Sequence, residues 1–125
     1  MSINIAHPRV YAPGADVTAE ATAAVTARRF VGISGNRTVD GSIAVAHATA
    51  AGRAFGVAKE DAATGDLLGV ARDGVVKVTT GGAIAAGADV EVGAAGRAVT
   101  KTSGIAVGYA ITAAANNTDA EIALL

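Results

Sequence analysis

The sequence contains no cysteine and no tryptophan, and only two prolines, two tyrosines and two phenylalanines among its 125 residues. The absence of cysteine excludes disulfides, thiolate metal sites and cysteine nucleophiles. Because aromatics are scarce, the hydrophobic content of 51% consists largely of alanine and valine, which bury little area each. The 16 glycines raise the entropy cost of folding. We therefore expect a small core, for which burial between subunits compensates.

Charge is also nearly balanced, with 10 Lys and Arg against 11 Asp and Glu and a net charge of −1. This balance disfavours direct binding of nucleic acid or of an anionic membrane. No apolar run approaches the ~18 residues of a membrane span, and the first residues lack the pattern of a secretory signal. We expect a soluble protein that is synthesised in a cytoplasm.

The chain length fits one compact domain. Residues 1–14 hold both prolines, Pro8 and Pro13, and no hydrophobic period. Proline removes a backbone donor and biases the preceding residue toward extended geometry. We expect an extended N-terminal arm over 1–14 and a single domain over 15–125.

Helix and strand compete over Asp16–Arg28, because its alanines favour a helix. Apolar residues occupy the odd positions from Val17 to Ala27, and polar residues occupy most even ones. This alternation and the repeated threonines predict a strand.

Two Asp-Gly pairs, Asp40-Gly41 and Asp73-Gly74, lie between apolar segments. Asp-Gly favours the type I′ turn of a β-hairpin. The second pair predicts a hairpin between 67–71 and 75–79. Further strands are predicted at 53–58, 89–92, 97–101, 105–111 and 119–124. Short strands at this spacing indicate an all-β fold, either a sandwich or a small barrel.

A faint internal repeat relates Gly56-Val57-Ala58 to Gly108-Tyr109-Ala110 at an offset of 52 residues. The same offset relates Val70-Ala71 to Ile122-Ala123. It predicts two related β units, each built around a glycine-interrupted strand. The aromatic residues predicted as core anchors are Phe30, Phe55 and Tyr109.

No pattern in the sequence predicts catalysis. His7 and His47 are far apart in sequence and lack the spacing of metal ligands. The carboxylates of Glu60, Asp61 and Asp66 fit a solvated turn better than an acid–base pair. The glycine-rich segments lack the Lys-Ser/Thr ending of a phosphate loop. We expect no catalytic residue, no cofactor and no metal.

Taken in order, several segments resemble a family of tailed-phage capsid decoration proteins, also called cement or head-stabilising proteins. Each segment is weak alone, and their order and spacing over about 8–125 carry the likeness. The segments are 13–19, 55–58, 65–70, 73–78, 82–87 and 108–110 with the C-terminal strand.

The resemblance implies a β-barrel or β-tulip body that assembles as a homotrimer on the outside of an icosahedral head. It implies that the protein clamps the major capsid protein and stabilises the shell against the pressure of packaged DNA. The expected location is the outer surface of the virion head, and an N-terminal arm often reaches onto the capsid in such proteins.

The arm residues predicted to bind the capsid are Ile3, Ile5, His7, Arg9 and Tyr11. The first three share one side of an extended segment, which can pair with an exposed sheet edge. Arg9 can pair with a carboxylate at the rim. The alternatives are that the arm packs on its own trimer or stays disordered.

Two other functions remain open at this point. One is a head-completion or tail-tube β protein of a phage, which would form rings. The other is a small enzyme or ligand-binding β-barrel, which the scarcity of aromatic and convergent polar residues disfavours.

Overall fold

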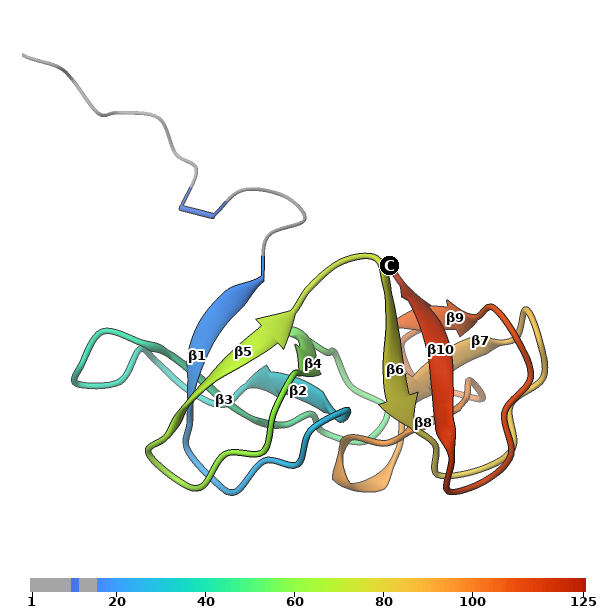
Figure 1. Cartoon of the computed structure of the whole chain (residues 1–125), viewed down its shortest axis with the longest axis horizontal. Helices are drawn as coiled ribbons and strands as arrows, with labels where there is room; N and C mark the ends of the chain where they lie inside the picture. The colour runs from blue at the N-terminus through green and yellow to red at the C-terminus, as the bar shows by residue number, and fades with distance from the viewer. Residues whose placement is uncertain (1–9, 12–15) are drawn as a thin grey trace, which may run out of the picture.

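The computed structural model describes residues 10–11 and 16–125, and these are arranged as two β units side by side (Figure 1). The all-β prediction is confirmed: apart from one short 3-10 turn (η1, Ala94–Gly96), the regular structure of these residues is strand. Residues 1–9 and 12–15, which include most of the predicted arm 1–14, lie outside the described residues.

The first unit is a closed barrel of five strands in the order β1-β3-β2-β4-β5. β1 pairs with β3 in parallel, and the other pairs of the barrel are antiparallel. The strands are β1 Val17–Ala21, β2 Phe30–Ile33, β3 Ile43–His47, β4 Gly56–Ala58 and β5 Leu67–Ala71.

The second unit is a five-stranded antiparallel sheet in the order β6-β10-β9-β7-β8. An isolated parallel bridge between Thr80 and Ala98 joins the end of β6 to β8. The strands are β6 Val75–Thr79, β7 Asp89–Val92, β8 Ala98–Thr100, β9 Gly108–Ala110 and β10 Asp119–Leu124.

The predicted internal repeat is confirmed by strand register. Val31 pairs with Gly56 in the first unit, and Val90 pairs with Gly108 in the second. The bridge Thr80–Ala98 corresponds in the same way to the β1–β3 pair of Ala21 and Val45.

The offset between the two units varies along the chain. It is 59 residues for β2 and β7 (31 against 90), 53 for β3 and β8 (45 against 98) and 52 for β4 and β9 (56 against 108). Most of this change arises between the second and third strands. The first unit has eleven residues (34–44) between paired Ile33 and Val45, and the second has five (93–97) between paired Val92 and Ala98.

Glycine starts the fourth strand of each unit because the neighbouring strand passes too close for a side chain. A Cβ on Gly56 would lie 2.5 Å from the carbonyl oxygen of Ala71, and one on Gly108 would lie 2.5 Å from that of Ala123. The two strands are therefore equivalent in packing as well as in register.

One local prediction needs correction at Asp73-Gly74. The strands 67–71 and 75–79 form, but they do not pair with each other: β5 pairs with β1 and β4, and β6 pairs with β10. Only Gly74 has a positive φ, so the type I′ turn, which needs two such residues, does not form. The segment links the two units instead.

Two further predictions are also corrected. The strand predicted over Asp16–Arg28 ends at Ala21, because the paired part of β5 begins at Leu67; Val25 then rejoins the barrel through one bridge to Ala62. Around Asp40-Gly41, the flanking residues Thr38 and Val39 form a turn and not a strand.

The two units share their larger core. One cluster fills the first barrel and includes Val31, Val45, Leu68 and Val70. The larger cluster fills the second unit but also contains Phe30, Ala48 and Val57 from the first. These three residues belong to the wall of the first barrel, so the second unit is packed against the outside of that wall.

Candidate interaction surface

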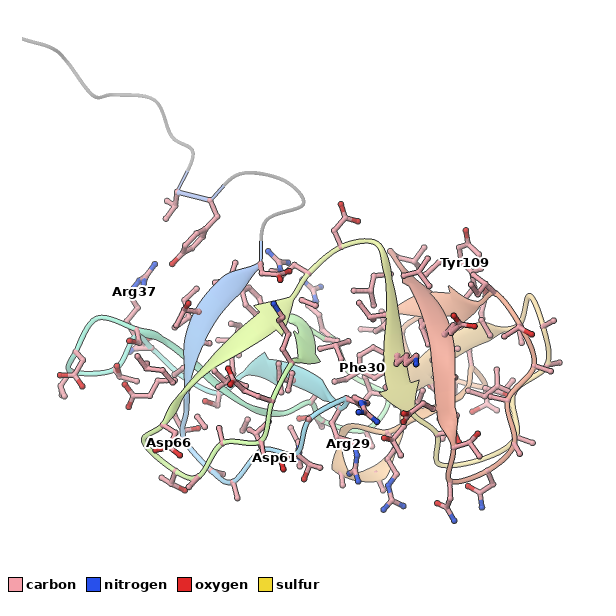
Figure 2. The ribbon with its side chains drawn as sticks, in the orientation of Figure 1. Arg29, Phe30, Arg37, Asp61, Asp66 and Tyr109 are labelled. Carbon is pink, nitrogen blue, oxygen red and sulfur yellow. The ribbon has the colours of Figure 1, made fainter. Side chains whose placement is uncertain are left out.

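The acidic residues between β4 and β5 hold turns together. The amide of Ala27 donates to Asp61 Oδ1 at 2.7 Å, and the amide of Ala63 donates to Asp66 Oδ2 at 3.1 Å. Glu60 Oε1 accepts from the amide of Gly69 at 3.0 Å. Figure 2 shows Asp61 and Asp66 on the loops at one edge of the first barrel. Backbone contacts of this kind favour the turn interpretation over acid–base chemistry.

His47 lies at the end of β3, where its Nε2 accepts a hydrogen bond from the amide of Thr26 at 3.0 Å. Partial burial, and secondarily the positive charge of Arg29, lower its pKa below the ordinary value of 6.5. Both the bond and the charge favour the neutral imidazole. Among the described residues, no cluster of three or more His, Asp or Glu side chains could hold a metal ion.

In the part of the chain that the structure describes, no helix has the length and apolar character needed to cross a membrane.

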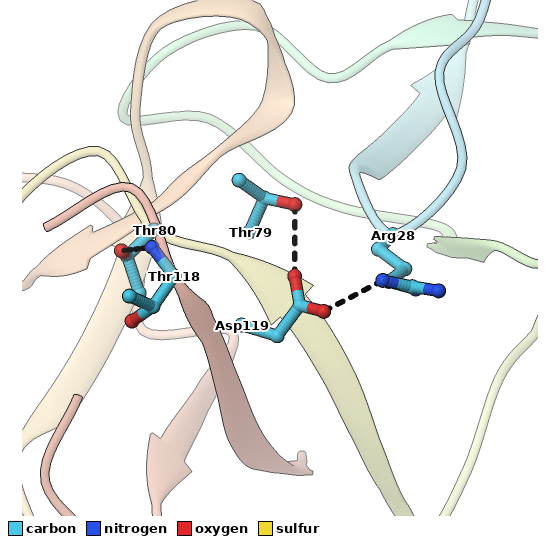
Figure 3. A network of polar contacts seen from close by, with 5 residues as sticks. All are labelled: Arg28, Thr79, Thr80, Thr118 and Asp119. Carbon is cyan, nitrogen blue, oxygen red and sulfur yellow. Dashed lines mark hydrogen bonds and ion pairs between the residues drawn. The ribbon is translucent and has the colours of Figure 1, made fainter. Parts of the chain in front are cut away.

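The junction between the two units is polar at its rim (Figure 3). Arg28 Nη1 donates to Asp119 Oδ2 at 2.7 Å, and Thr79 Oγ1 donates to Asp119 Oδ1 at 3.2 Å. The amide of Thr79 also donates to the carbonyl of Arg28 at 2.9 Å. Arg29 Nη1 donates to the carbonyl of Ala95 at 3.1 Å. Both arginines of the pair 28–29 thus tie the first barrel to the second unit.

A groove of about 520 Å³ opens on the first barrel. Its walls come from the end of β2 with Ile33, the end of β3 with His47, and the segment 53–55. Arg72 lies over the ring of Phe55, with Cζ 4.1 Å from the centroid, and its Nε donates to the carbonyl of Phe55 at 2.8 Å. The groove is therefore largely apolar with a positive rim.

The three predicted core anchors lie in different environments. Phe30 is fully buried between the units, and Phe55 is half-buried against the core of the first barrel and lines the groove. Tyr109 is 44% exposed, so its prediction as a core anchor is wrong. It stands on the outer face of β9 because the neighbouring Gly108 and Ala110 take the inward positions (Figure 2).

Of the arm residues predicted to bind a partner, only Tyr11 lies within the described residues, and its side chain is exposed. Ile3, Ile5, His7 and Arg9 lie outside them. The sequence interpretation missed the groove, because the offset of 52 residues does not align Ile33 with Val92. Only the strand register of the structure aligns exposed Ile33 with buried Val92.

The comparisons with known proteins are consistent with this arrangement. The family profile described as phage cement protein matches residues 11–125. The crystal structure of the head fiber gp8.5 N base in bacteriophage phi29 is similar, with a TM-score of 0.75 and 26% sequence identity. The similarity covers 89% of this chain and 93% of that one. No curated protein sequence matches the chain.

A match over nearly the whole chain establishes the family, and the similar fold is also that of a phage head protein. The chain is a capsid-associated structural protein of a bacteriophage and belongs to the phage cement protein family.

Proposed function

We propose that this protein binds the outer surface of an icosahedral phage head as a homotrimer, contacts the major capsid protein and stabilises the shell against the pressure of packaged DNA. It has no enzymatic role in this proposal. The observation that carries the proposal is membership of the cement family over residues 11–125. The head-fiber similarity supports it.

The surface also supports a function in assembly. Large apolar side chains lie exposed on both units, among them Ile33, Leu67, Tyr109 and Ile111. Polar turns bind their own backbone, as at Asp61 and Asp66. Exposed apolar groups of this kind are typical of surfaces that bind other proteins.

Heads that lack the protein provide the direct test. Purified protein should co-sediment with expanded heads and appear in micrographs as regular density on the outer surface. Decorated heads should retain their DNA at temperatures at which bare heads release it, because binding to the intact shell stabilises that state. Density only at the portal vertex or along the tail would contradict the proposal and favour the head-completion or tail-tube alternative.

The arm carries part of the proposed capsid contact through Ile3, Ile5, His7, Arg9 and Tyr11. Deleting residues 2–11 should leave the melting temperature and the oligomer mass nearly unchanged and weaken head binding by roughly 2 kcal/mol or more for each lost anchor. The measurement is a binding isotherm on heads.

A matched pair of substitutions tests which side of the arm binds. Ile5→Asp should weaken head binding, whereas Asn4→Asp adds the same charge on the other side of an extended segment and should have little effect. Undiminished affinity after deletion of 2–11 would place the contact on the two β units.

A further inference from the structure

The same position of the repeat is buried in one unit and exposed in the other. Ile33 ends β2 opposite Val45, and Val92 ends β7 opposite Ala98. Val92 is 1% exposed and Ile33 is 58% exposed. Since the two residues have the same place in the same fold, the difference arises from what covers them.

Val92 is covered by the first unit of its own chain. The amide of Ala51 donates to the carbonyl of Val92 at 2.8 Å, and the amide of Ile105 donates to the carbonyl of Ala51 at 3.2 Å. Phe30 and Val57 of the first unit belong to the same core cluster as Val92.

The equivalent place in the first unit is the groove. By register and offset, the counterparts of Val92 and Ile105 are Ile33 and Arg53, and both line it. Gly32 stands where the second unit has Glu91, so no side chain fills the space at that position. No unit precedes the first one among the described residues 16–125 to cover the groove as the first unit covers Val92.

The face of the first unit that packs against the second unit has an equivalent face in the second unit, and that face is exposed. Phe30 and Val57 in the first unit correspond to Asp89 and Tyr109 in the second, because each pair is joined across the same two strands. Val57 is 3% exposed, whereas Tyr109 is 44% exposed. Figure 2 shows Phe30 between the units and Tyr109 at the upper edge of the second unit.

We propose that the contact between the two units is repeated between chains: the face around Asp89 and Tyr109 of one copy docks on the Ile33 groove of another. The occupant is a second copy of this chain because the fold itself contains the template. The negative charge of Asp89 also complements the positive charges of Arg53 and Arg72, which line the groove. The contact is head-to-tail, so it closes a ring or continues as a filament; the closed form deepens the homotrimer of the proposed function and rests on it.

The test uses two substitutions at exposed positions, Ile33→Asp in the groove and Tyr109→Asp on the docking face. Each variant alone should be a monomer of 12.1 kDa by light scattering, whereas the unchanged protein forms a closed oligomer. Mixed together, the two variants should form a one-to-one dimer, because each keeps the half of the contact that the other has lost. Far-UV circular dichroism and melting temperature report whether each variant is folded.

Val75→Asp is the matched control. Val75 is 54% exposed on the outer face of β6, next to Ala123 and close to Tyr109 in the same row of the sheet. Register aligns it with Asp16, which is exposed in the first unit, so the contact between units does not use this position. The variant should keep the mass of the unchanged protein.

The proposal is overturned if both variants keep the wild-type mass, if their mixture stays monomeric while wild type assembles, or if wild type is monomeric both free and on heads. Loss of head binding by Ile33→Asp with no change in mass would also overturn it, because the groove would then hold capsid protein. Decoration of heads by the wild-type protein is measured independently of these results. Failure of the docking proposal therefore does not contradict the proposed function.

Discussion

At the residue scale, small side chains allow strands to pass unusually close to one another. Alanine and glycine face inward along β4 and β9, where larger residues would collide with the neighbouring backbone. A Cβ on Gly56 would also lie 2.5 Å from Cγ1 of Val70, and one on Gly108 would lie 2.6 Å from Cγ2 of Ile122. Both units therefore depend on one glycine each for the approach of their fourth and fifth strands.

We expect Gly56→Ala and Gly108→Ala to lower the free energy of unfolding by about 1–3 kcal/mol or more each, because a backbone carbonyl must shift to admit the methyl group. Thermal or denaturant unfolding measures the effect. Gly35→Ala is the control, since a Cβ there meets nothing within 4 Å, and it should change stability by less than ~0.5 kcal/mol. Equal stability of all three variants would contradict the close approach.

His47 should make stability depend on pH. Its pKa is lowered in the folded protein by burial and by Arg29, so the unfolded chain binds the proton more readily. Stability contributed by the neutral ring is complete above 6.5 and is lost as pH falls from 6.5 toward the lowered pKa. Unfolding curves from pH 8 to pH 5 should show this loss in wild type and a smaller one in His47→Asn; an unchanged slope would exclude the role of this group.

At the element scale, each unit closes where its first strand meets its third. In the first barrel, β1 and β3 pair over three residues from Ala19 to Ala21. In the second unit, the closure is the single bridge from Thr80 to Ala98. Thr80 is fully buried, and its Oγ1 donates to the carbonyl of Ala115 at 2.7 Å. Thr80 Oγ1 also accepts a hydrogen bond from the amide of Thr118 at 3.2 Å (Figure 3).

Replacing the Thr80 hydroxyl should lower the free energy of unfolding more than breaking the exposed ion pair between Arg28 and Asp119. Thr80→Val removes two hydrogen bonds at a buried position and should lower the free energy of unfolding by about 1–3 kcal/mol. Asp119→Asn weakens a largely exposed pair with Arg28 and should cost less than about 1 kcal/mol. Denaturant unfolding of the two variants compares them, and the reverse order would show that the junction pair matters more than the closure.

At the scale of the whole molecule, the two units form one body because the larger core draws on both. The side chains of Phe30 and Val57 lie on the outer side of the first barrel and belong to the core cluster that fills the second unit. Neither unit can keep these side chains buried alone, since Phe30 belongs to the wall of one and the core of the other.

We therefore expect a single unfolding transition. In calorimetry, the measured enthalpy should equal the van't Hoff enthalpy. Phe30→Ala should lower the free energy of unfolding by about 3–5 kcal/mol and shift the whole transition without splitting it. Two separate transitions in wild type would show that the units unfold independently.

The sequence alone determined the elements that depend on local patterns. Turn-like segments between short apolar stretches predicted the strands 89–92 and 119–124 with the observed bounds, and the offset of 52 residues predicted two related units. These features could be predicted because successive side chains of a strand point to opposite faces of the sheet, and because each unit needs a glycine at the position where a neighbouring backbone passes close by.

Only the tertiary structure decided which strands pair and what covers each unit. Asp73-Gly74 has the local pattern of a hairpin but links two units, because β5 and β6 each find partners elsewhere in the chain. Tyr109 and Val57 occupy equivalent positions in the repeat, yet one is exposed and the other is buried. Burial depends on which surface lies opposite, and for Val57 that surface belongs to residues distant in the sequence, so no local pattern could predict it.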